Sequence, residues 1–179
     1  MDHATPSDAD YTTSTNPERF AGVVDCAEQL VAELLTEFVV ERSDGDWSVD
    51  FPRLVGELTR GCPDPVRLDP SAGVPIVFGF TSAPGVAIRV GRNVELLFPA
   101  CLCDACNHQV DEVCDDLRFH VEAVTSGSFT EVVTRRAHRW AFEVAGMRHA
   151  GDYRPRREER RALGDRGEFR SEPWKRRTP

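Results

Sequence analysis

Three cysteines fall within six residues of the chain, at Cys101, Cys103 and Cys106. Thiolates are favoured ligands of structural zinc, and the two intervening residues between Cys103 and Cys106 are a common ligand spacing. Cys101 supplies a third thiol close by. This stretch therefore predicts a metal centre with zinc as the expected ion, and no other cofactor is expected.

A tetrahedral zinc site needs a fourth ligand, which must come from elsewhere in the chain. Cys114 lies two helical turns beyond Cys106 in the predicted helix, about 12 Å along its axis, which is too far. His108 would project from nearly the opposite side of the same helix. The remaining candidates for the fourth ligand are Cys62, His138 and His149.

Two other interpretations of the cysteines remain open. A Cys-x-x-Cys sequence between a strand and a helix is typical of thiol oxidoreductases, in which the helix N-terminus stabilises a thiolate. Against this, Asp104 lies between Cys103 and Cys106 and adds negative charge, and no βαβ unit is predicted around them. Alternatively, the cysteines only pack as small buried side chains.

Other catalytic patterns are missing from the sequence. There is no Gly-x-Ser-x-Gly, no phosphate-binding glycine loop and no His-Glu-x-x-His. His120 lies beside the apolar face of its helix, where we expect a packed boundary residue. The acidic side chains of that helix are expected to form its solvated side; they are Asp111, Glu112, Asp115 and Asp116. These observations favour a protein that is not an enzyme.

The elements that position the cysteines follow from apolar periodicity. Large apolar residues alternate over 76–80, 86–90 and 94–98, with turns at 82–85 and 91–93, which predicts an antiparallel meander. Apolar residues at helical spacing predict one helix from Asn16 to about Val40 and another from about Cys106 to Gly127. The expected fold class is α+β, an antiparallel meander of three to five strands with two main helices packed on one face.

Shorter segments are less sharply defined. Residues 47–51 fit a short strand, or residues 50–52 cap a short helix whose apolar positions are Leu54, Val55 and Leu58. Residues 61–75, which contain four prolines, are expected to form a loop. Residues 128–131 have capping-box spacing, so a short helix is predicted there with Phe129, Val132 and Val133 inward. Alternation over 140–144 predicts a further strand.

The chain of 179 residues is long enough for one domain with a real core. We expect a disordered N-terminal segment over 1–15, a single α+β domain over 16–151 and an Arg-rich tail over 152–179, extended or partly docked. No apolar run approaches the roughly 20 residues that cross a bilayer, and the acidic N-terminus is not a signal peptide. A cytoplasmic protein with reduced thiols and no membrane partner is therefore expected.

The charge is divided unevenly along the chain. Residues 1–133 contain 8 Lys and Arg against 23 Asp and Glu, whereas residues 134–179 contain 14 against 7. A basic tail can bind nucleic acid, but acidic residues interleave with the arginines here and aromatic residues do not. We therefore expect no nucleic-acid partner, and the sequence defines no other partner.

Three segments carry a resemblance to a known group of proteins. NPERF, GFTSAPGVAIRVGR and FPACLCDAC resemble, in this order, an uncharacterised actinobacterial family with a Pro-x-Cys-x-Cys-Asp-x-Cys motif. The motif corresponds to Pro99, Cys101, Cys103, Asp104 and Cys106, with Leu102 where the resemblance implies glycine. The resemblance implies the extent of the domain and the motif, and no activity.

The function expected from the sequence is a non-enzymatic binding or interaction module, stabilised by a metal at its cysteines. The alternative is a thiol-disulfide oxidoreductase or redox sensor that uses Cys103 and Cys106.

Overall fold

Two antiparallel sheets and two long helices make up the core of the computed structural model, which describes residues 13–106, 108–155 and 166–178. The first sheet has the order β1-β2-β3-β4-β5 and the second the order β8-β7-β6-β9. The strands of the first sheet are β1 (Val40–Asp44), β2 (Val66–Pro70), β3 (Ile76–Phe80), β4 (Val86–Val90) and β5 (Val94–Phe98). Those of the second are β6 (Phe129–Val133), β7 (His138–Val144), β8 (Met147–Tyr153) and β9 (Gly167–Arg170).

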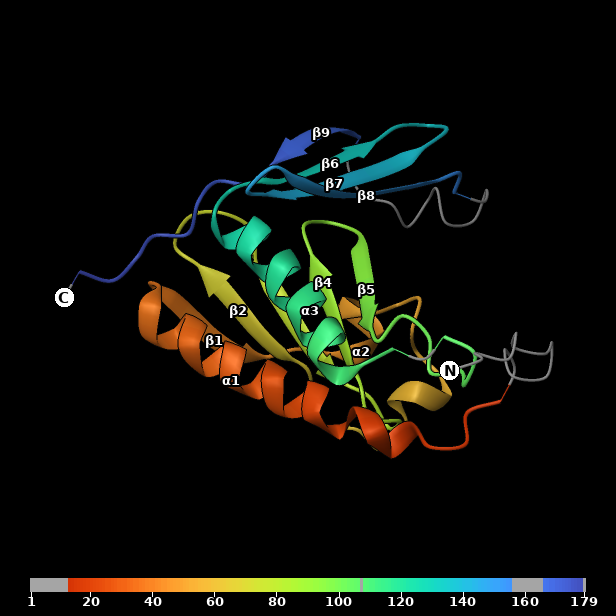
Figure 1. Cartoon of the computed structure of the whole chain (residues 1–179). Helices are drawn as coiled ribbons and strands as arrows, with labels where there is room; N and C mark the ends of the chain where they lie inside the picture. Colours follow the sequence, from red (N-terminus) through yellow and green to blue (C-terminus); the bar gives the residue numbers. More distant parts are fainter. Residues whose placement is uncertain (1–12, 107, 156–165, 179) are drawn as a thin grey trace.

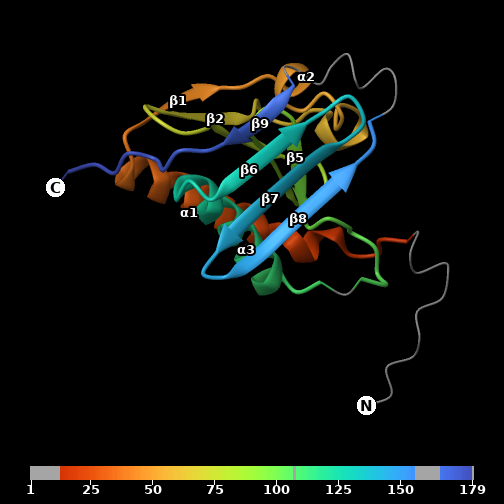
Figure 2. The same cartoon turned by 90° about the horizontal axis from the view of Figure 1, so that it is seen from above.

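Two long helices lie side by side against the first sheet, and the later one in the chain also lies against the second sheet (Figure 1). They are α1 (Ala21–Glu37), which follows the 3-10 turn η1 (Pro17–Phe20), and α3 (Val110–Thr125). Side chains of both helices pack on the first sheet and form the core with it. The second sheet packs on another side of α3 (Figure 2). The expected α+β class is confirmed, and the expected cover of two helices on one face is confirmed in part, because a second sheet adds a layer. No helix in the described ranges has the length and apolar character to cross a membrane.

The predicted meander is confirmed in extent and register. Ile88 of β4 lies opposite Phe78 of β3 and Leu96 of β5, and it has no exposed surface. The intervening Val77 and Ala87 point to the other face, where they pack on Phe51 in a second, smaller cluster. The period-two alternation thus assigned the two faces of these strands correctly.

Two predicted segments are corrected by the structure. Residues 66–70, expected within a loop, form β2. Pro65 lies just before this strand and Pro70 is its last residue, so the residues between them can pair with β1 and β3. Residues 129–133, expected as a helix, form β6, with Phe129, Glu131 and Val133 buried. The β-branched residues of this segment pair with β7 and β9, and this pairing outweighs the capping-box spacing.

The region after α1 is also more regular than expected. The helix ends at Glu37, three residues before the expected end, and the chain continues as edge strand β1. Both alternatives for the next region are wrong: residues 47–50 form a short helix, α2 (Trp47–Asp50), in place of the strand, and no helix forms over residues 52–56. Asp46 caps α2 by accepting hydrogen bonds from the backbone N–H groups of Ser48 and Val49. A second 3-10 turn, η2 (Glu57–Thr59), follows.

The end of the chain packs into the body. Trp174 is 3% exposed and meets Phe38 edge to face, with ring centroids 5.6 Å apart. Its Nε1 donates a hydrogen bond to the Val74 carbonyl at 2.9 Å. The expected boundary at residue 151 stays a prediction; β8 runs through it to Tyr153. Residues 156–165, part of the expected tail, lie outside the described residues, as do residues 1–12 of the expected N-terminal segment.

Candidate metal centre

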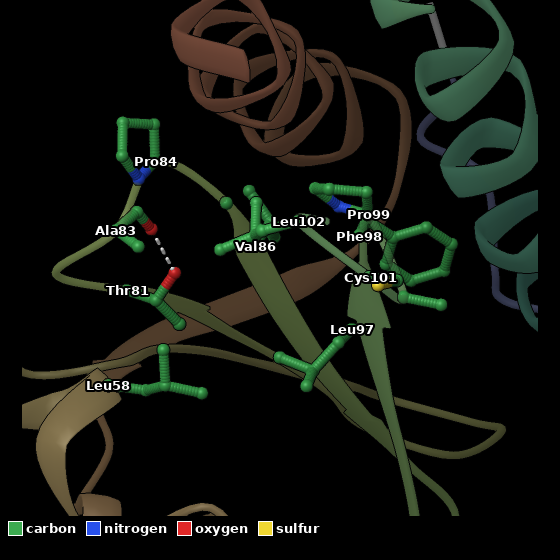
Figure 3. A pocket seen from close by; sticks show the side chains of 12 residues that line it. Leu58, Thr81, Ala83, Pro84, Val86, Leu97, Phe98, Pro99, Cys101 and Leu102 are labelled. Carbon is green, nitrogen blue, oxygen red and sulfur yellow. Dashed lines mark hydrogen bonds between the residues drawn. The ribbon is translucent and has the colours of Figure 1, made fainter. Parts of the chain in front are cut away.

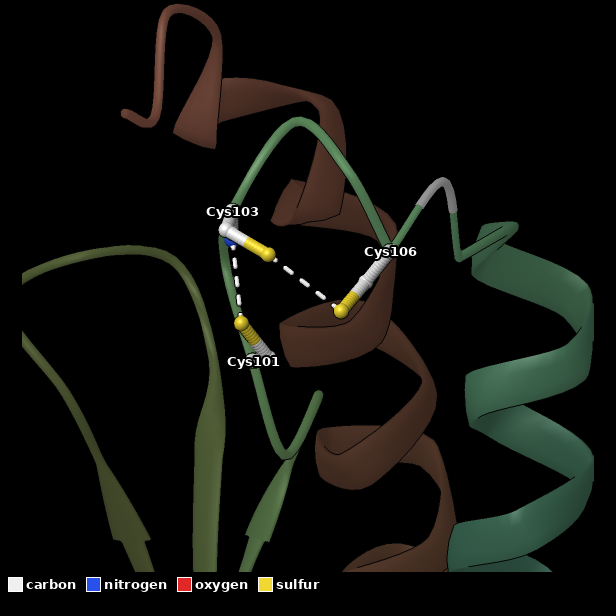
Figure 4. Close-up of side chains that lie close together, drawn as sticks. All are labelled: Cys101, Cys103 and Cys106. Atoms are coloured by element: carbon white, nitrogen blue, oxygen red, sulfur yellow. Dashed lines mark hydrogen bonds between the residues drawn. The ribbon is translucent and has the colours of Figure 1, made fainter. Parts of the chain in front are cut away.

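The connection from β5 to α3 brings together the sulfur atoms of Cys101, Cys103 and Cys106, here called the cysteine cluster. All three atoms lie within 4.8 Å of one another. The Sγ atoms of Cys103 and Cys106 point toward each other at 3.2 Å, and the Cys103 backbone N–H donates to Cys101 Sγ at 3.3 Å (Figure 4). Cys103 is buried, whereas Cys106 is exposed, so the cluster lies at the surface with one side toward solvent.

The segment before α1 holds this loop in place. The Asp104 backbone N–H donates to the Thr13 carbonyl at 2.9 Å, and the Asp104 carboxylate accepts from the Thr15 N–H at 3.1 Å. Arg19 donates from Nη2 to the Cys103 carbonyl at 3.3 Å, and its Nη1 lies 4.0 Å from the Asp104 carboxylate. Thr13 and Thr15 are thus docked on the cluster loop, and a guanidinium charge lies beside the cysteines.

The helix after the cluster starts later than the sequence indicates. Val110 is the first residue of α3, and Gln109 is its N-cap, whose N–H donates to the Glu112 carboxylate at 3.3 Å. Cys106 therefore precedes the helix and does not lie in its first turn. This corrects the expected arrangement, in which the positive end of the helix would stabilise a Cys106 thiolate, since the effect fades beyond the first turn.

The three thiols affect one another's ionisation. Hydrogen bonds from Cys101 and Cys106 hold the pKa of Cys103 below its ordinary value. The hydrogen bond to Cys103 is the main cause that raises the pKa of Cys106 to about 11. Once one of the three thiols has lost its proton, its negative charge makes deprotonation of the next one less favourable. A cation among the three would remove this opposition.

The candidates for a fourth ligand lie elsewhere. Cys62 Sγ is 3.5 Å from the Leu58 carbonyl oxygen, and burial raises the pKa of its thiol. His138 is bonded to Glu131 within the second sheet, and His149 Nδ1 lies 3.3 Å from Asp116. Within the described ranges, no fourth His, Cys, Asp or Glu side chain joins the cysteine cluster.

Two further cysteines pack between the long helices. Cys114 Sγ lies 3.9 Å from the Gly22 carbonyl oxygen of α1. Burial, followed by the hydrogen bond to Cys26, raises the pKa of Cys114 to about 12. Neither residue belongs to the cluster, as the helical spacing predicts for Cys114. They are packed thiols.

A small pocket lies beside the cluster at the end of the meander (Figure 3). It has a volume of about 180 Å³, and its lining is mainly apolar, with Leu97, Val86 and Pro84 among the side chains that form it. Cys101 and Leu102 line it as well, so the pocket and the cluster share the Cys101 side chain. A group bound in this pocket would lie next to an ion at the cluster.

A second group of potential ligands was missed from the sequence. Asp116, His120 and His149 place a carboxylate oxygen and two ring nitrogens within 4.8 Å of one another. The i, i+4 spacing of Asp116 and His120 in α3 was the available signal. His149 comes from β8, and its position follows only from the arrangement of the second sheet.

Comparison with known proteins places the chain in a family. The model of DUF6226, a family of unknown function, matches residues 1–178. The chain belongs to this family. No curated protein matches the chain, and no solved structure does. Membership of DUF6226 agrees with the expectation of a family without an assigned activity; the actinobacterial source and the cysteine motif of the resemblance stay predictions.

Proposed function

We propose that this member of DUF6226 is a non-enzymatic binding module whose cysteine cluster holds one zinc ion. The convergence of three thiols from a stretch of six residues is the observation that supports it. Cys101, Cys103 and Cys106 are the proposed ligands. Thiolate sulfur suits zinc better than it suits magnesium or calcium, which favour oxygen ligands.

The geometry of the cluster is close to what zinc requires. Three sulfurs bound at about 2.3 Å to one tetrahedral ion lie roughly 4 Å apart. The separation of 3.2 Å between Cys103 and Cys106 would have to widen by less than about 1 Å. This adjustment involves only a surface loop and its side-chain rotamers.

The surrounding charge also fits an ion with three thiolates. Such a complex carries one net negative charge, and the Arg19 guanidinium donates to the Cys103 carbonyl beside it. The docking of Thr15 and Arg19 on Asp104 holds the loop that carries the ligands. A ligand loop that is held before the ion binds loses less conformational freedom on binding.

The fourth coordination position of the zinc ion is where we propose that the module binds its ligand. No fourth protein ligand joins the cluster among the described residues, so water or an incoming group completes the coordination. The apolar pocket shares Cys101 and can receive the body of that group. A cytoplasmic location stays a prediction and would keep the three thiols reduced.

Cobalt substitution tests the proposal. We expect Co²⁺ added to metal-free protein to give thiolate-to-cobalt charge-transfer absorption at one equivalent, because three sulfurs bind it. The Cys103→Ser variant should lose most of this absorption, and the Cys26→Ser variant, whose thiol packs between the helices, should retain it. Absorption that is absent from the wild type, or unchanged in Cys103→Ser, would contradict the proposal.

A thiol-disulfide function is the second candidate, favoured by the 3.2 Å separation of Cys103 and Cys106 Sγ. In that reaction the two thiols would form a disulfide and pass two electrons and two protons to a disulfide substrate, which becomes two thiols. The late start of α3 weighs against it, because no helix end stabilises the Cys106 thiolate. Reduction of a model disulfide that is lost in Cys106→Ser would favour this candidate over zinc binding.

A further inference from the structure

Asp116, His120 and His149, here called the histidine site, lie between α3 and β8, apart from the cysteine cluster. Asp116 and His120 are one helical turn apart on α3, and the β7–β8 hairpin brings His149 to them. Asp116 Oδ1 is 3.3 Å from His120 Nδ1 and 3.3 Å from His149 Nδ1. The carboxylate therefore lies within reach of both imidazoles at once.

These separations match those of ligands around one ion. A divalent transition ion lies about 2.1 Å from nitrogen and oxygen ligands. Neighbouring ligand atoms are then about 3.0 Å apart in an octahedron and about 3.4 Å apart in a tetrahedron. Both distances to Asp116 Oδ1 fall within this interval, so an ion could enter with small side-chain movements.

The surroundings hold both imidazoles in position. His120 is 7% exposed and packs between Phe98 and Phe142, with ring centroids 5.4 and 4.7 Å away. His149 stacks on Phe119 at 4.3 Å. Burial is the main cause that lowers the pKa of His120. Ligands fixed by packing need little reorganisation when an ion binds.

A hydrogen bond orients the buried ring. His120 Nδ1 lies 2.7 Å from the Asp116 backbone carbonyl oxygen. A carbonyl oxygen only accepts, so this contact places the hydrogen of a neutral His120 on Nδ1 and a lone pair on Nε2. The 3.3 Å separation from Asp116 Oδ1 is measured from Nδ1, so an ion held at this separation takes the Nδ1 lone pair, the proton moves to Nε2 and this hydrogen bond is lost. Coordination through Nε2 would keep the hydrogen bond, in the orienting role that such bonds have for metal-bound histidines.

We propose that Asp116, His120 and His149 form a second metal site, which binds a divalent transition ion of the zinc class independently of the cysteine cluster. Two imidazoles and one carboxylate suit Zn²⁺, Co²⁺ and Ni²⁺. The side chains of Asp116 and His149 are 44% and 50% exposed, so the ion reaches the site from solvent. The chain supplies three ligands, and water fills the remaining positions.

Zinc titration of the full chain in a Cys101→Ser, Cys103→Ser, Cys106→Ser background isolates the histidine site. We expect calorimetry to show one equivalent of Zn²⁺ bound. Loss of a residue that only orients a metal ligand typically weakens metal binding 10–100-fold. Loss of a ligand itself, in His149→Ala or Asp116→Asn, should therefore weaken zinc binding at least about tenfold. Asp115→Asn, an exposed carboxylate on the same helix, is the matched control and should bind as the background does.

The results of this titration distinguish the histidine site from the cysteine cluster. A folded background that binds no zinc, or binds it equally well after His149→Ala, would overturn the second site and leave the cluster proposal untouched. If the background does not fold by circular dichroism, the wild-type cysteines are kept. His149→Ala then lowers cobalt bound at saturation from two equivalents to one, with thiolate-to-cobalt absorption unchanged. Two equivalents retained in this variant would overturn the proposal.

Discussion

Glu131 Oε1 lies 2.8 Å from His138 Nε2, and neither side chain has any exposed surface. The second carboxylate oxygen of Glu131 accepts a hydrogen bond from the Arg92 backbone N–H at 2.8 Å. Arg92 lies in the turn between β4 and β5, whereas Glu131 lies in β6. One buried carboxylate therefore connects the first sheet to the second.

Removal of this carboxylate should destabilise the whole fold. Glu131→Ala leaves the buried His138 ring and the Arg92 N–H without their partner, and breaking a buried pair typically costs about 3–5 kcal/mol. Urea unfolding at pH 7 measures the change. Glu143→Ala, which removes an exposed carboxylate from the adjacent strand β7, is the control and should change the free energy of unfolding by less than about 0.5 kcal/mol. Equal effects of the two variants would contradict the inter-sheet role.

The meander supplies a second stability prediction. Ile88 has no exposed surface in the centre of β4, so Ile88→Ala should lower the free energy of unfolding by about 2–5 kcal/mol through the cavity that it leaves. Met147, which is 58% exposed at the start of β8, provides the comparison. Met147→Ala should cost less than about 0.5 kcal/mol. A loss below 1 kcal/mol for Ile88→Ala would place this residue outside a packed core.

Glu95 should give the fold a measurable pH dependence. Burial raises the pKa of this carboxyl above 4.5, against the opposing effect of Arg53, so the folded protein binds the proton more tightly than the unfolded chain. Below 4.5 the group is protonated in both states. As the pH rises from there through the folded pKa, stability is lost, because the unfolded chain ionises first.

The Glu95→Gln variant isolates this effect. Urea unfolding of wild type and variant between pH 4 and pH 7 gives the difference in their free energies of unfolding. Relative to the variant, the wild type should become less stable as the pH rises, since glutamine does not titrate. A difference that changes in the opposite direction would show that Arg53 and Arg89 outweigh burial at Glu95.

The end of the chain should be part of the cooperative fold. Trp174→Ala removes a buried indole that packs on Phe38 and donates to the Val74 carbonyl. The expected loss in the free energy of unfolding is about 3–5 kcal/mol. Lys175→Ala, at the exposed neighbouring position, is the control and should leave the unfolding midpoint unchanged. An unchanged midpoint in Trp174→Ala would show that the end of the chain is bound only loosely.

Local patterns predicted the elements whose partners are close in sequence. Ile76, Ile88 and Leu96 alternate with residues of the other face, and short turns join their strands, so the register follows from neighbouring residues. The strand β6 could not be predicted in this way. Its partner β7 follows after a short turn, but its other partner β9 starts more than 30 residues later. Glu131 breaks the apolar alternation of the strand, and its burial depends on His138 and Arg92.

The same difference between close and distant partners in the sequence applies to the two candidate sites. Cys101, Cys103 and Cys106 are so close in sequence that a single loop can bring their sulfur atoms together. The sequence could not show that His138 and His149 lie away from the cluster, because their surroundings depend on the second sheet. The β6–β7 hairpin takes His138 to Glu131, and the packing of the second sheet on α3 takes His149 to Asp116. Asp116 and His120 were interpreted as a solvated acid and a packed residue because their third partner was unknown.

The zinc content of protein purified without added metal tests the central proposal most directly. Three thiolates hold a zinc ion tightly at neutral pH, so the wild type should carry close to one equivalent bound at the cysteine cluster. The Cys103→Ser variant should lose that equivalent, whereas Cys26→Ser, the control outside the cluster, should retain it. Less than about 0.1 equivalent in the wild type, with the cluster thiols titrating freely, would contradict the account.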